Sequence, residues 1–345
     1  MKTHFMHNSG ALQAVLLALL ALHAIAGNPR TELAEEVRDK GWIVFSARSA
    51  NGSWDLFVMR PDGSGRKALT DTPEFEEAAP RYSPDGSKLL YRVMKRGTVL
   101  DHDHWGFLGS LAVADWDGRN RRLLGGEGDF PWASWSPDGN QVACLTLKGI
   151  QFVDVETGRV VRQIDRQGVF QQMYWSPDGR SLCGVANYRG EIWTIVRVDI
   201  ESGKSNEINS FQSCTPDWFA DSRRVIYSCR PAGQRANRGY GWTQLWMADA
   251  TGGGHRLVYG EDGTHVYGGA TSPDDKYVLF SRFNEDGGGS EKAGGALHLM
   301  RLEDVPMIRG RSAALRKLHP NTNDGPVLLL GRGWEPHWTY AELEY

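Results

Sequence analysis

The 345-residue sequence lacks an excess of basic charge and any internal apolar run long enough to cross a membrane. Its 39 Lys and Arg stand against 42 Asp and Glu, which leaves a formal net charge of −3. A nucleic-acid partner is therefore not indicated, because such proteins carry a basic patch or stripe. Beyond the first 26 residues, no stretch is apolar enough to cross a bilayer.

Several motifs of catalysis are also absent. The sequence contains no Gly-x-Ser-x-Gly nucleophile elbow, no phosphate-binding P-loop and no Ser-x-Asp-x-Gly-x-x-Trp box of the sialidase type. No pattern of an α/β-hydrolase domain follows the repeats described below, which argues against a peptidase.

The first 26 residues have the pattern of a secretory signal peptide. An apolar run from Ala11 to Leu22 is followed by the small-x-small triplet Ala24-Ile25-Ala26, so we expect cleavage after Ala26. An uncleaved anchor is the alternative, although the run is short for a membrane span. We expect a periplasmic or secreted protein with no membrane span after cleavage, a lead-in segment at 27–40 and one domain at 41–345.

Cysteine is scarce, with four in the chain. Cys144 and Cys183 fall at similar places in two repeats, which predicts small core residues. Cys214 and Cys229 flank a predicted hairpin turn. If that turn is centred between Asp221 and Ser222, the two lie opposite one another, and an oxidising compartment permits a disulfide between them. Two free buried thiols are the alternative.

What the sequence does contain is a repeated turn. Trp-Ser-Pro-Asp-Gly stands at 135–139 and 175–179, and Tyr82 begins a third copy. Weaker copies begin at Trp218, Thr271 and Trp338, so the spacing is roughly 40 to 67 residues. Pro, Asp and Gly are the residues of a tight turn, and β-rich runs follow each copy. The repeat therefore predicts a hairpin that recurs six times.

Two further strands complete each repeat. A third run is predicted at 56–59, 111–115, 150–154, 195–199, 245–249 and 297–300, and a polar fourth strand follows a Gly-containing turn. Four short antiparallel strands in forty-odd residues are typical of a propeller blade. The chain opens with a second-type strand at 42–46 and ends with an innermost-type strand at 335–339. We therefore predict an all-β, six-bladed propeller, closed by three N-terminal strands and one C-terminal strand.

These repeats resemble the blades of TolB-type, WD-repeat-like propellers. The resemblance rests on Asp55–Gly63 with Arg66–Thr70, followed by Ala79–Gly86, and it covers roughly residues 41–340. It implies the propeller fold, and by analogy it favours a protein partner.

The longest insertions define one face of the predicted propeller, which we call the loop-rich face. They connect second to third strands at 95–109, 231–243 and 284–295. Function in such folds concentrates on loops over a rigid scaffold. The first insertion carries His102, His104 and Trp105 between aspartates. With His265 and His337 these histidines form a candidate site for a divalent metal, and a solvated loop is the alternative.

A second group of candidates is basic and aromatic. Arg235, Arg238, Tyr240 and Trp242 lie in one insertion, and Trp334 and Glu335 lie in the last innermost strand. Arg with Trp and Tyr can grip a carboxylate, a sugar face or a protein partner.

We therefore expect a monomeric, non-enzymatic binding module for an envelope protein or polysaccharide, acting through the loop-rich face and the channel mouth. The alternative is a metal-dependent lyase or hydrolase of acidic sugars, since the larger oligogalacturonate lyase propellers have similar blades. Convergence of the four histidines would favour the enzyme.

Overall fold

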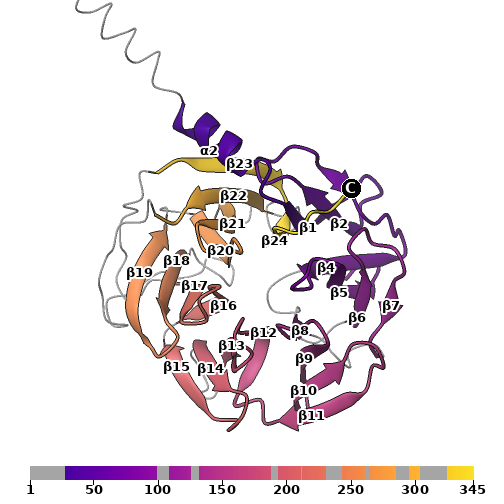
Figure 1. The fold of residues 1–345 in the computed structure, drawn as a ribbon, viewed down its shortest axis with the longest axis vertical. Coiled ribbons are helices and arrows are strands. Elements are labelled where there is room, and N and C mark those ends of the chain that lie inside the picture. Colours follow the sequence, from indigo (N-terminus) through magenta and orange to yellow (C-terminus); the bar gives the residue numbers. More distant parts are fainter. Residues whose placement is uncertain are drawn as a thin grey trace, which may run out of the picture.

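The computed structural model describes residues 28–98, 109–125, 132–187, 193–210, 212–230, 243–260, 264–284, 295–303 and 325–345. Within these residues, six four-stranded antiparallel sheets are arranged as blades around a central axis (Figure 1). The predicted six-bladed β-propeller is confirmed.

Each blade runs from an innermost strand at the channel to an outer strand at the rim. The innermost strands are β24 (Trp334–Thr339) of blade 1, β4 (Phe75–Tyr82), β8 (Trp132–Trp135), β12 (Val169–Trp175), β16 (Ser213–Trp218) and β20 (Thr264–Thr271). Second strands are β1 (Trp42–Arg48), β5 (Lys88–Lys95), β9 (Gln141–Thr146), β13 (Ser181–Ala186), β17 (Arg224–Cys229) and β21 (Tyr277–Asn284). Third strands are β2 (Trp54–Met59), β6 (Ser110–Asp115), β10 (Gly149–Asp154), β14 (Thr194–Asp199), β18 (Gln244–Asp249) and β22 (Ala296–Arg301). Outer strands are β3 (Lys67–Ala68), β7 (Arg122–Leu123), β11 (Val160–Ile164), β15 (Ser205–Asn209), β19 (Gly253–Tyr259) and β23 (Val327–Arg332).

Blade 1 closes the ring with strands from both ends of the chain. β24 pairs with β1, with Ile43 opposite Trp338 and Val44 opposite His337, so the predicted three-plus-one clasp is confirmed. The chain enters β1 through Gly41 at φ 76°, where a Cβ would lie 1.9 Å from the Thr339 carbonyl oxygen. Only glycine fits this approach.

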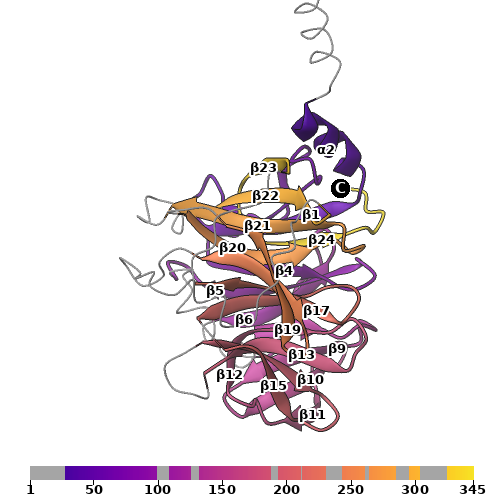
Figure 2. The same ribbon diagram turned by 90° about the vertical axis from the view of Figure 1, so that its left-hand side faces the viewer.

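A helix, α2 (Pro29–Val37), precedes the first blade, within the predicted lead-in segment. Asn28 caps it by accepting the Arg30 N–H at 3.0 Å. Leu33 and Val37 are fully buried in an apolar cluster that contains residues of blades 1 and 6. The helix therefore covers the junction at which the ring closes, beside β23 (Figures 1 and 2). No helix in the described part of the chain combines the length and apolar character that a membrane crossing needs.

In four blades, a Ser-Pro-Asp turn joins the innermost strand to the second strand. In blade 3, the Ser136 hydroxyl donates to Asp138 at 2.6 Å and accepts the Gln141 N–H at 2.9 Å. The same two bonds recur at Ser83, Ser176 and Ser272. These local bonds explain why the motif recurs in four blades.

In two blades, the Trp before the turn connects its blade to the preceding one. Trp135 donates its indole N–H to the Arg81 carbonyl at 3.1 Å, and Trp218 donates to the Tyr174 carbonyl at 2.9 Å. Because the bonded carbonyls lie in the neighbouring innermost strands, the turn motif also fixes the spacing of blades around the channel.

Five innermost strands share a backbone irregularity. A residue with positive φ stands three positions before the repeat aromatic at Ala79, Gln172, Thr215 and Glu335, and Gly268 has the same place before Thr271 in blade 6. Non-glycine residues in this conformation cost about 1–2 kcal/mol each. All five strands shift pairing register there, as β-bulges do, and the residues that follow the bulge are re-aimed.

The bulge in β16 also corrects the prediction for Cys214 and Cys229. Cys214 pairs with Ser228, and Cys229 pairs with Ser213, so the two cysteines are offset by one residue. Neighbouring residues of a strand point to opposite faces, so the two thiols do not face one another. All four cysteines are free and buried, and the directly opposed geometry was wrong.

Candidate functional site

The six innermost strands end around a pocket at one mouth of the channel, which we call the turn-face pocket. Its volume is about 490 Å³. It is lined by the ends of innermost strands and by the repeat turns that follow them: residues 81–85, 134, 135, 137, 174–177, 217, 218, 220, 271–273 and 337–341. This mouth lies opposite the loop-rich face, because each innermost strand runs from one face to the other.

The rim and walls of the pocket differ in character. Pro84, Pro177 and Pro273 are exposed at the rim, and Pro137 is half-buried. The aromatic rings among the lining residues are mostly buried between blades, with exposures of 2 to 8% at Tyr82, Trp135, Tyr174, Trp218 and Trp338. A ligand in the pocket therefore meets proline rings, turn backbone and polar groups more than open aromatic faces.

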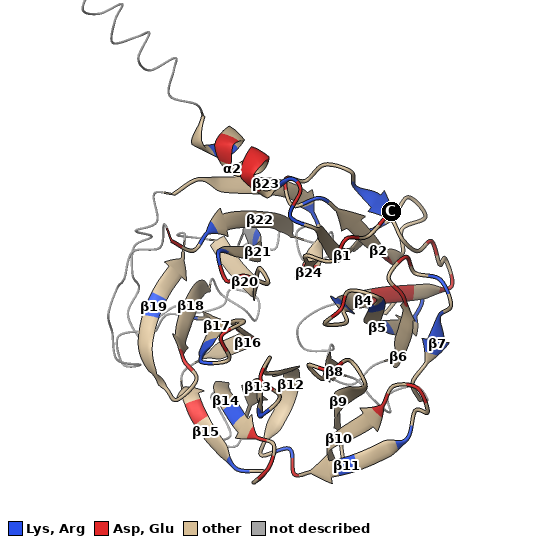
Figure 3. Ribbon diagram, in the orientation of Figure 1, with Lys and Arg blue, Asp and Glu red and all other residues tan. Residues whose placement is uncertain are grey.

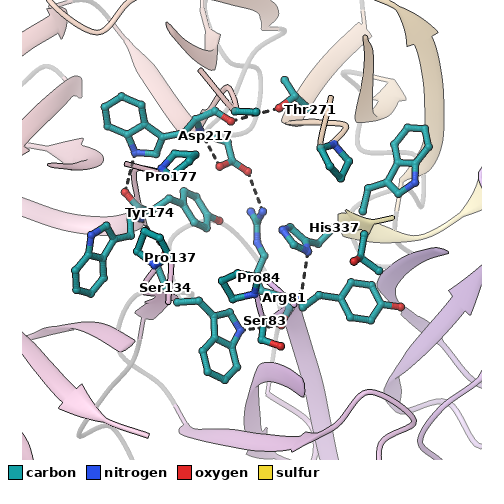
Figure 4. Close-up of a pocket in the computed structure, with 18 of the residues that line it drawn as sticks. Arg81, Ser83, Pro84, Ser134, Pro137, Tyr174, Pro177, Asp217, Thr271 and His337 are labelled. Atoms are coloured by element: carbon teal, nitrogen blue, oxygen red, sulfur yellow. Dashed lines mark hydrogen bonds and ion pairs between the residues drawn. The ribbon is translucent and has the colours of Figure 1, made fainter. Parts of the chain in front are cut away.

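An ion pair crosses the channel at the bottom of the pocket. Arg81 of blade 2 and Asp217 of blade 5 come from opposite sides of the ring, and their Nη1 and Oδ2 atoms are 2.8 Å apart (Figures 1 and 4). The side chains are only 14% and 17% exposed. The guanidinium also lies 4.2 Å over the ring of Tyr174.

Local bonds hold this pair in place. The Asp217 carboxylate accepts the Trp218 N–H at 2.8 Å through its other oxygen. Burial alone would lower the pKa of Arg81, but the neighbouring Tyr174 and Asp217 outweigh burial and raise it above the ordinary value. Arg81 therefore stays charged at every accessible pH, and the pair is a fixed polar floor.

His337 stands beside Arg81 in the same pocket (Figure 4). Its Nδ1 accepts the backbone N–H of Tyr82 at 3.2 Å. Burial, and secondarily the charge of Arg81, lowers the pKa of His337 well below its ordinary value. The ring is therefore neutral, with its proton on Nε2, which makes Nε2 a hydrogen-bond donor.

Glu335 lies deeper in the channel wall, two residues before His337. It is 9% exposed, and its Oε2 has no hydrogen-bond partner among the described residues. Burial raises the pKa of Glu335 to about 8, against the opposing effect of Arg81 and Arg92. At neutral pH the group is therefore mainly an uncharged acid.

Hydrogen bonds between blades fill the channel near Glu335. Gln172 accepts the Thr215 N–H at 2.7 Å and donates to the Tyr267 hydroxyl at 2.5 Å, which joins blades 4, 5 and 6. Thr215 in turn accepts the Gly268 N–H at 3.3 Å. These bonds use the strained bulge residues, which suggests why the bulges are kept.

The structure places four of the sequence-predicted site residues. Trp334 is 2% exposed and stacks on Tyr267 at 5.3 Å between ring centres, so it is a core residue. His265 is 2% exposed, and its Nδ1 shares a hydrogen bond of 2.8 Å with the Thr243 hydroxyl. His337 reaches the pocket and Glu335 lies in the channel wall below it.

His265 and His337 do not converge on one ion. His265 is the second residue of β20, whereas His337 is near the end of β24. Aligned on the repeat aromatic, the two are five positions apart, which is roughly 15 Å along the strands. No group of three or more potential metal ligands occurs within the part of the chain that the structure describes.

The remaining candidates, His102, His104, Trp105, Arg235, Arg238, Tyr240 and Trp242, lie outside the described residues. Their role at the loop-rich face stays a prediction.

Sequence reasoning missed Arg81, Tyr174 and Asp217. A signal was present, because each stands immediately before the repeat aromatic. The same position holds Ser134 and His337 in two other blades, and all five residues line the pocket. Reading the six copies as an aligned ring would have found the site.

Comparison with known proteins supports the fold. No protein-family model matches the chain. An uncharacterised protein of Agrobacterium fabrum is 31% identical over 121 residues, a match that spans 34% of this chain and only 40% of that protein. TolB from Acinetobacter baumannii has a TM-score of 0.60 at 17% identity, over 87% of this chain and 67% of its own. A protein assigned as TolB from Agrobacterium tumefaciens has a TM-score of 0.51 at 19% identity, over 85% and 90% of the two chains.

A chain of a nidogen/laminin complex also superposes, with a TM-score of 0.55 at 9% identity, over 86% of this chain and 98% of its own. Together the solved structures show that this chain has the TolB-type six-bladed propeller fold, as the sequence resemblance implied.

Proposed function

We propose that the protein is an exported binding module, periplasmic or secreted, that holds an envelope partner at the mouth of its channel. The turn-face pocket carries this proposal. It combines a volume of about 490 Å³ with walls that six blades hold rigidly and a floor that presents a buried ion pair. Concave sites with a few fixed polar groups are the usual form of binding sites.

A protein partner is favoured over a polysaccharide. Sugars are commonly held against exposed aromatic faces, and most aromatic rings around this pocket are buried. Exposed proline rings and turn backbone fit a peptide segment better. The fold is also that of TolB proteins, and one structural neighbour was solved in a nidogen/laminin complex.

The test is to fill the pocket without disturbing its walls. Ala220 is exposed at the rim, in the turn of blade 5, so Ala220→Trp should place an indole over the opening. Leu147→Trp is the matched control, because Leu147 is 79% exposed in the turn between β9 and β10, at the opposite face. The measurement is capture of envelope components by the immobilised mature protein and by each variant.

We expect Ala220→Trp to lose the components that the wild type and Leu147→Trp retain. Retention by Ala220→Trp with loss in Leu147→Trp would place binding on the loop-rich face and overturn the assignment of the pocket. Capture of the same components by all three proteins would count against both mouths of the channel as the binding site.

A further inference from the structure

We propose that the turn-face pocket takes a single carboxylate of a peptide partner, bound by the guanidinium of Arg81 and the Nε2–H of His337. The inference rests on the proposed binding function and names the chemical group that the pocket recognises. Its basis is the surplus of hydrogen-bond donors at the pocket floor.

The donor count at the floor favours an anion. A guanidinium has five N–H donors, of which Asp217 takes one and the side chain of Tyr174 takes another. His337 adds a donor, because its Nδ1 is occupied by the Tyr82 N–H and its proton is on Nε2. Both side chains line the same cavity, and Figure 4 shows the imidazole next to the guanidinium. Arg is the side chain best matched to the two oxygens of a carboxylate.

A cation fits this floor poorly. A ligand ammonium or guanidinium group would approach Arg81, a like charge held in place by Asp217 and by the Tyr174 ring. If it shared the Asp217 carboxylate, it would weaken an ion pair that is shielded from water. An incoming carboxylate can instead share Arg81 with Asp217.

Glu335 does not act as a second anionic partner of Arg81 at neutral pH. It lies close enough to feel the charge of Arg81, yet burial keeps it mostly protonated up to a pKa of about 8. Asp217 is therefore the carboxylate in direct contact with Arg81.

The surroundings limit the ligand to one carboxylate. Asp85 also lines the pocket, where hydrogen bonds from Ser83 and Ser87 hold its pKa below the ordinary value, and Asp217 is at the floor. Charged residues of both signs surround the mouth, with acidic residues in the repeat turns (Figure 3). A polyuronate, with a carboxylate on every sugar, would bring most of its charges against these aspartates. A peptide with a lone Asp or Glu, or a C-terminal carboxylate, would not.

The test uses small probes and the ring of His337 as the reporter. The mature protein, with histidine-selective isotope labelling, is titrated at constant ionic strength with N-acetylglutamate amide and, separately, with N-acetylglutamine amide. Loss of a signal in His337→Gln identifies the His337 resonance. We expect a saturable shift with the glutamate probe and none with its neutral twin.

Two variants test the role of Arg81. Asp217→Asn frees Arg81 from its competing carboxylate, so the glutamate probe should bind about tenfold more tightly. The double variant Arg81→Gln with Asp217→Asn keeps the shape of the pair without charge, and it should bind at least about tenfold more weakly than the wild type. If the double variant unfolds, as thermal melting would show, the Asp217→Asn titration still decides.

The proposal is overturned by equal shifts with both probes, by weaker binding in Asp217→Asn, or by full binding in the folded double variant. Digalacturonate is the third probe, and stronger binding of it than of the glutamate probe would assign the pocket to acidic sugars instead. The two proposals fail separately. If Ala220→Trp abolishes envelope capture but the glutamate probe does not shift the His337 signal, the binding function stands and the carboxylate proposal fails. If the glutamate probe shifts the His337 signal but Ala220→Trp does not affect envelope capture, the pocket binds a carboxylate and the proposed binding function fails.

Discussion

Glu335 is a buried acid on strained backbone, so its ionisation should govern part of the pH dependence of stability. Its pKa is raised from 4.5 to about 8, with burial as the main cause. An acid whose pKa is higher in the folded state than in the unfolded state makes its full contribution to stability below the unfolded-state pKa. That contribution is lost as the pH rises through the folded-state pKa. Glu335→Gln removes this loss. We expect the variant to match the wild type near about pH 4 and to exceed it by a few kcal/mol near about pH 9.

The measurement is chemical unfolding of both proteins at the two pH values. Glu342→Gln is the matched control, because Glu342 is exposed in the segment after β24. It should leave the pH profile unchanged. A stability difference for Glu335→Gln that is the same at both pH values would contradict the raised pKa.

At the same scale, the residues of the pocket show which features could be predicted from the sequence and which could not. The position before each repeat aromatic could be read from the aligned copies. The pairing of Arg81 with Asp217 could not, because the two are 136 residues apart and meet only when blades 2 and 5 face each other across the ring. The offset of Cys214 from Cys229 depends on a bulge at Thr215, a residue that no turn pattern marks.

At the scale of the element, the indole bonds between innermost strands should contribute measurably to stability. Trp218→Phe removes the buried hydrogen bond to the Tyr174 carbonyl. Trp175→Phe is the matched control, because the Trp175 Nε1 is buried and has no hydrogen-bond partner among the described residues. We expect Trp218→Phe to cost about 1–3 kcal/mol more than Trp175→Phe in the free energy of unfolding.

Equilibrium urea unfolding of the two variants provides the comparison. Both substitutions remove a similar ring volume, so equal losses would mean that packing, and not the hydrogen bond, is what the indole contributes. A larger loss in Trp175→Phe would contradict the assignment of the bond between blades.

The elements themselves were largely predictable. The predicted third strands at 111–115 and 150–154 match β6 and β10 closely, because alternating apolar residues and Gly-containing turns mark their ends. The bulges were not predictable. Ala79, Gln172 and Glu335 adopt positive φ without the glycine or asparagine that would reveal it, so their cause is the packing of innermost strands around the channel.

At the scale of the whole molecule, strand counting predicted the ring and its closure. Loop length, in contrast, led to the prediction of a site on the loop-rich face. The repeat turns lie on the opposite face and are short, so loop length did not mark them as a site. Five short turns and the segment after β24, arranged around one axis, nevertheless enclose the turn-face pocket, which no single repeat contains. A site built by rotational symmetry is therefore harder to see in a sequence than one built from a long loop.

Closure of the ring should depend on the helix that covers its junction. Leu33 of α2 is fully buried among side chains of blades 1 and 6, including Phe45, Leu297 and Leu330. Leu33→Ala should therefore lower the free energy of unfolding by about 2–5 kcal/mol.

Leu329→Ala is the matched control, because Leu329 lies on β23, next to the helix, but is 67% exposed. It should change stability by less than about 0.5 kcal/mol. Thermal unfolding, with hydrogen exchange of β24 and β1 as a local readout, measures both effects. If the helix is part of the clasp, Leu33→Ala speeds exchange first in β24, where the two ends of the chain pair. Loss of stability with unchanged exchange in β24 would mean that the helix packs on the propeller without holding the ring closed.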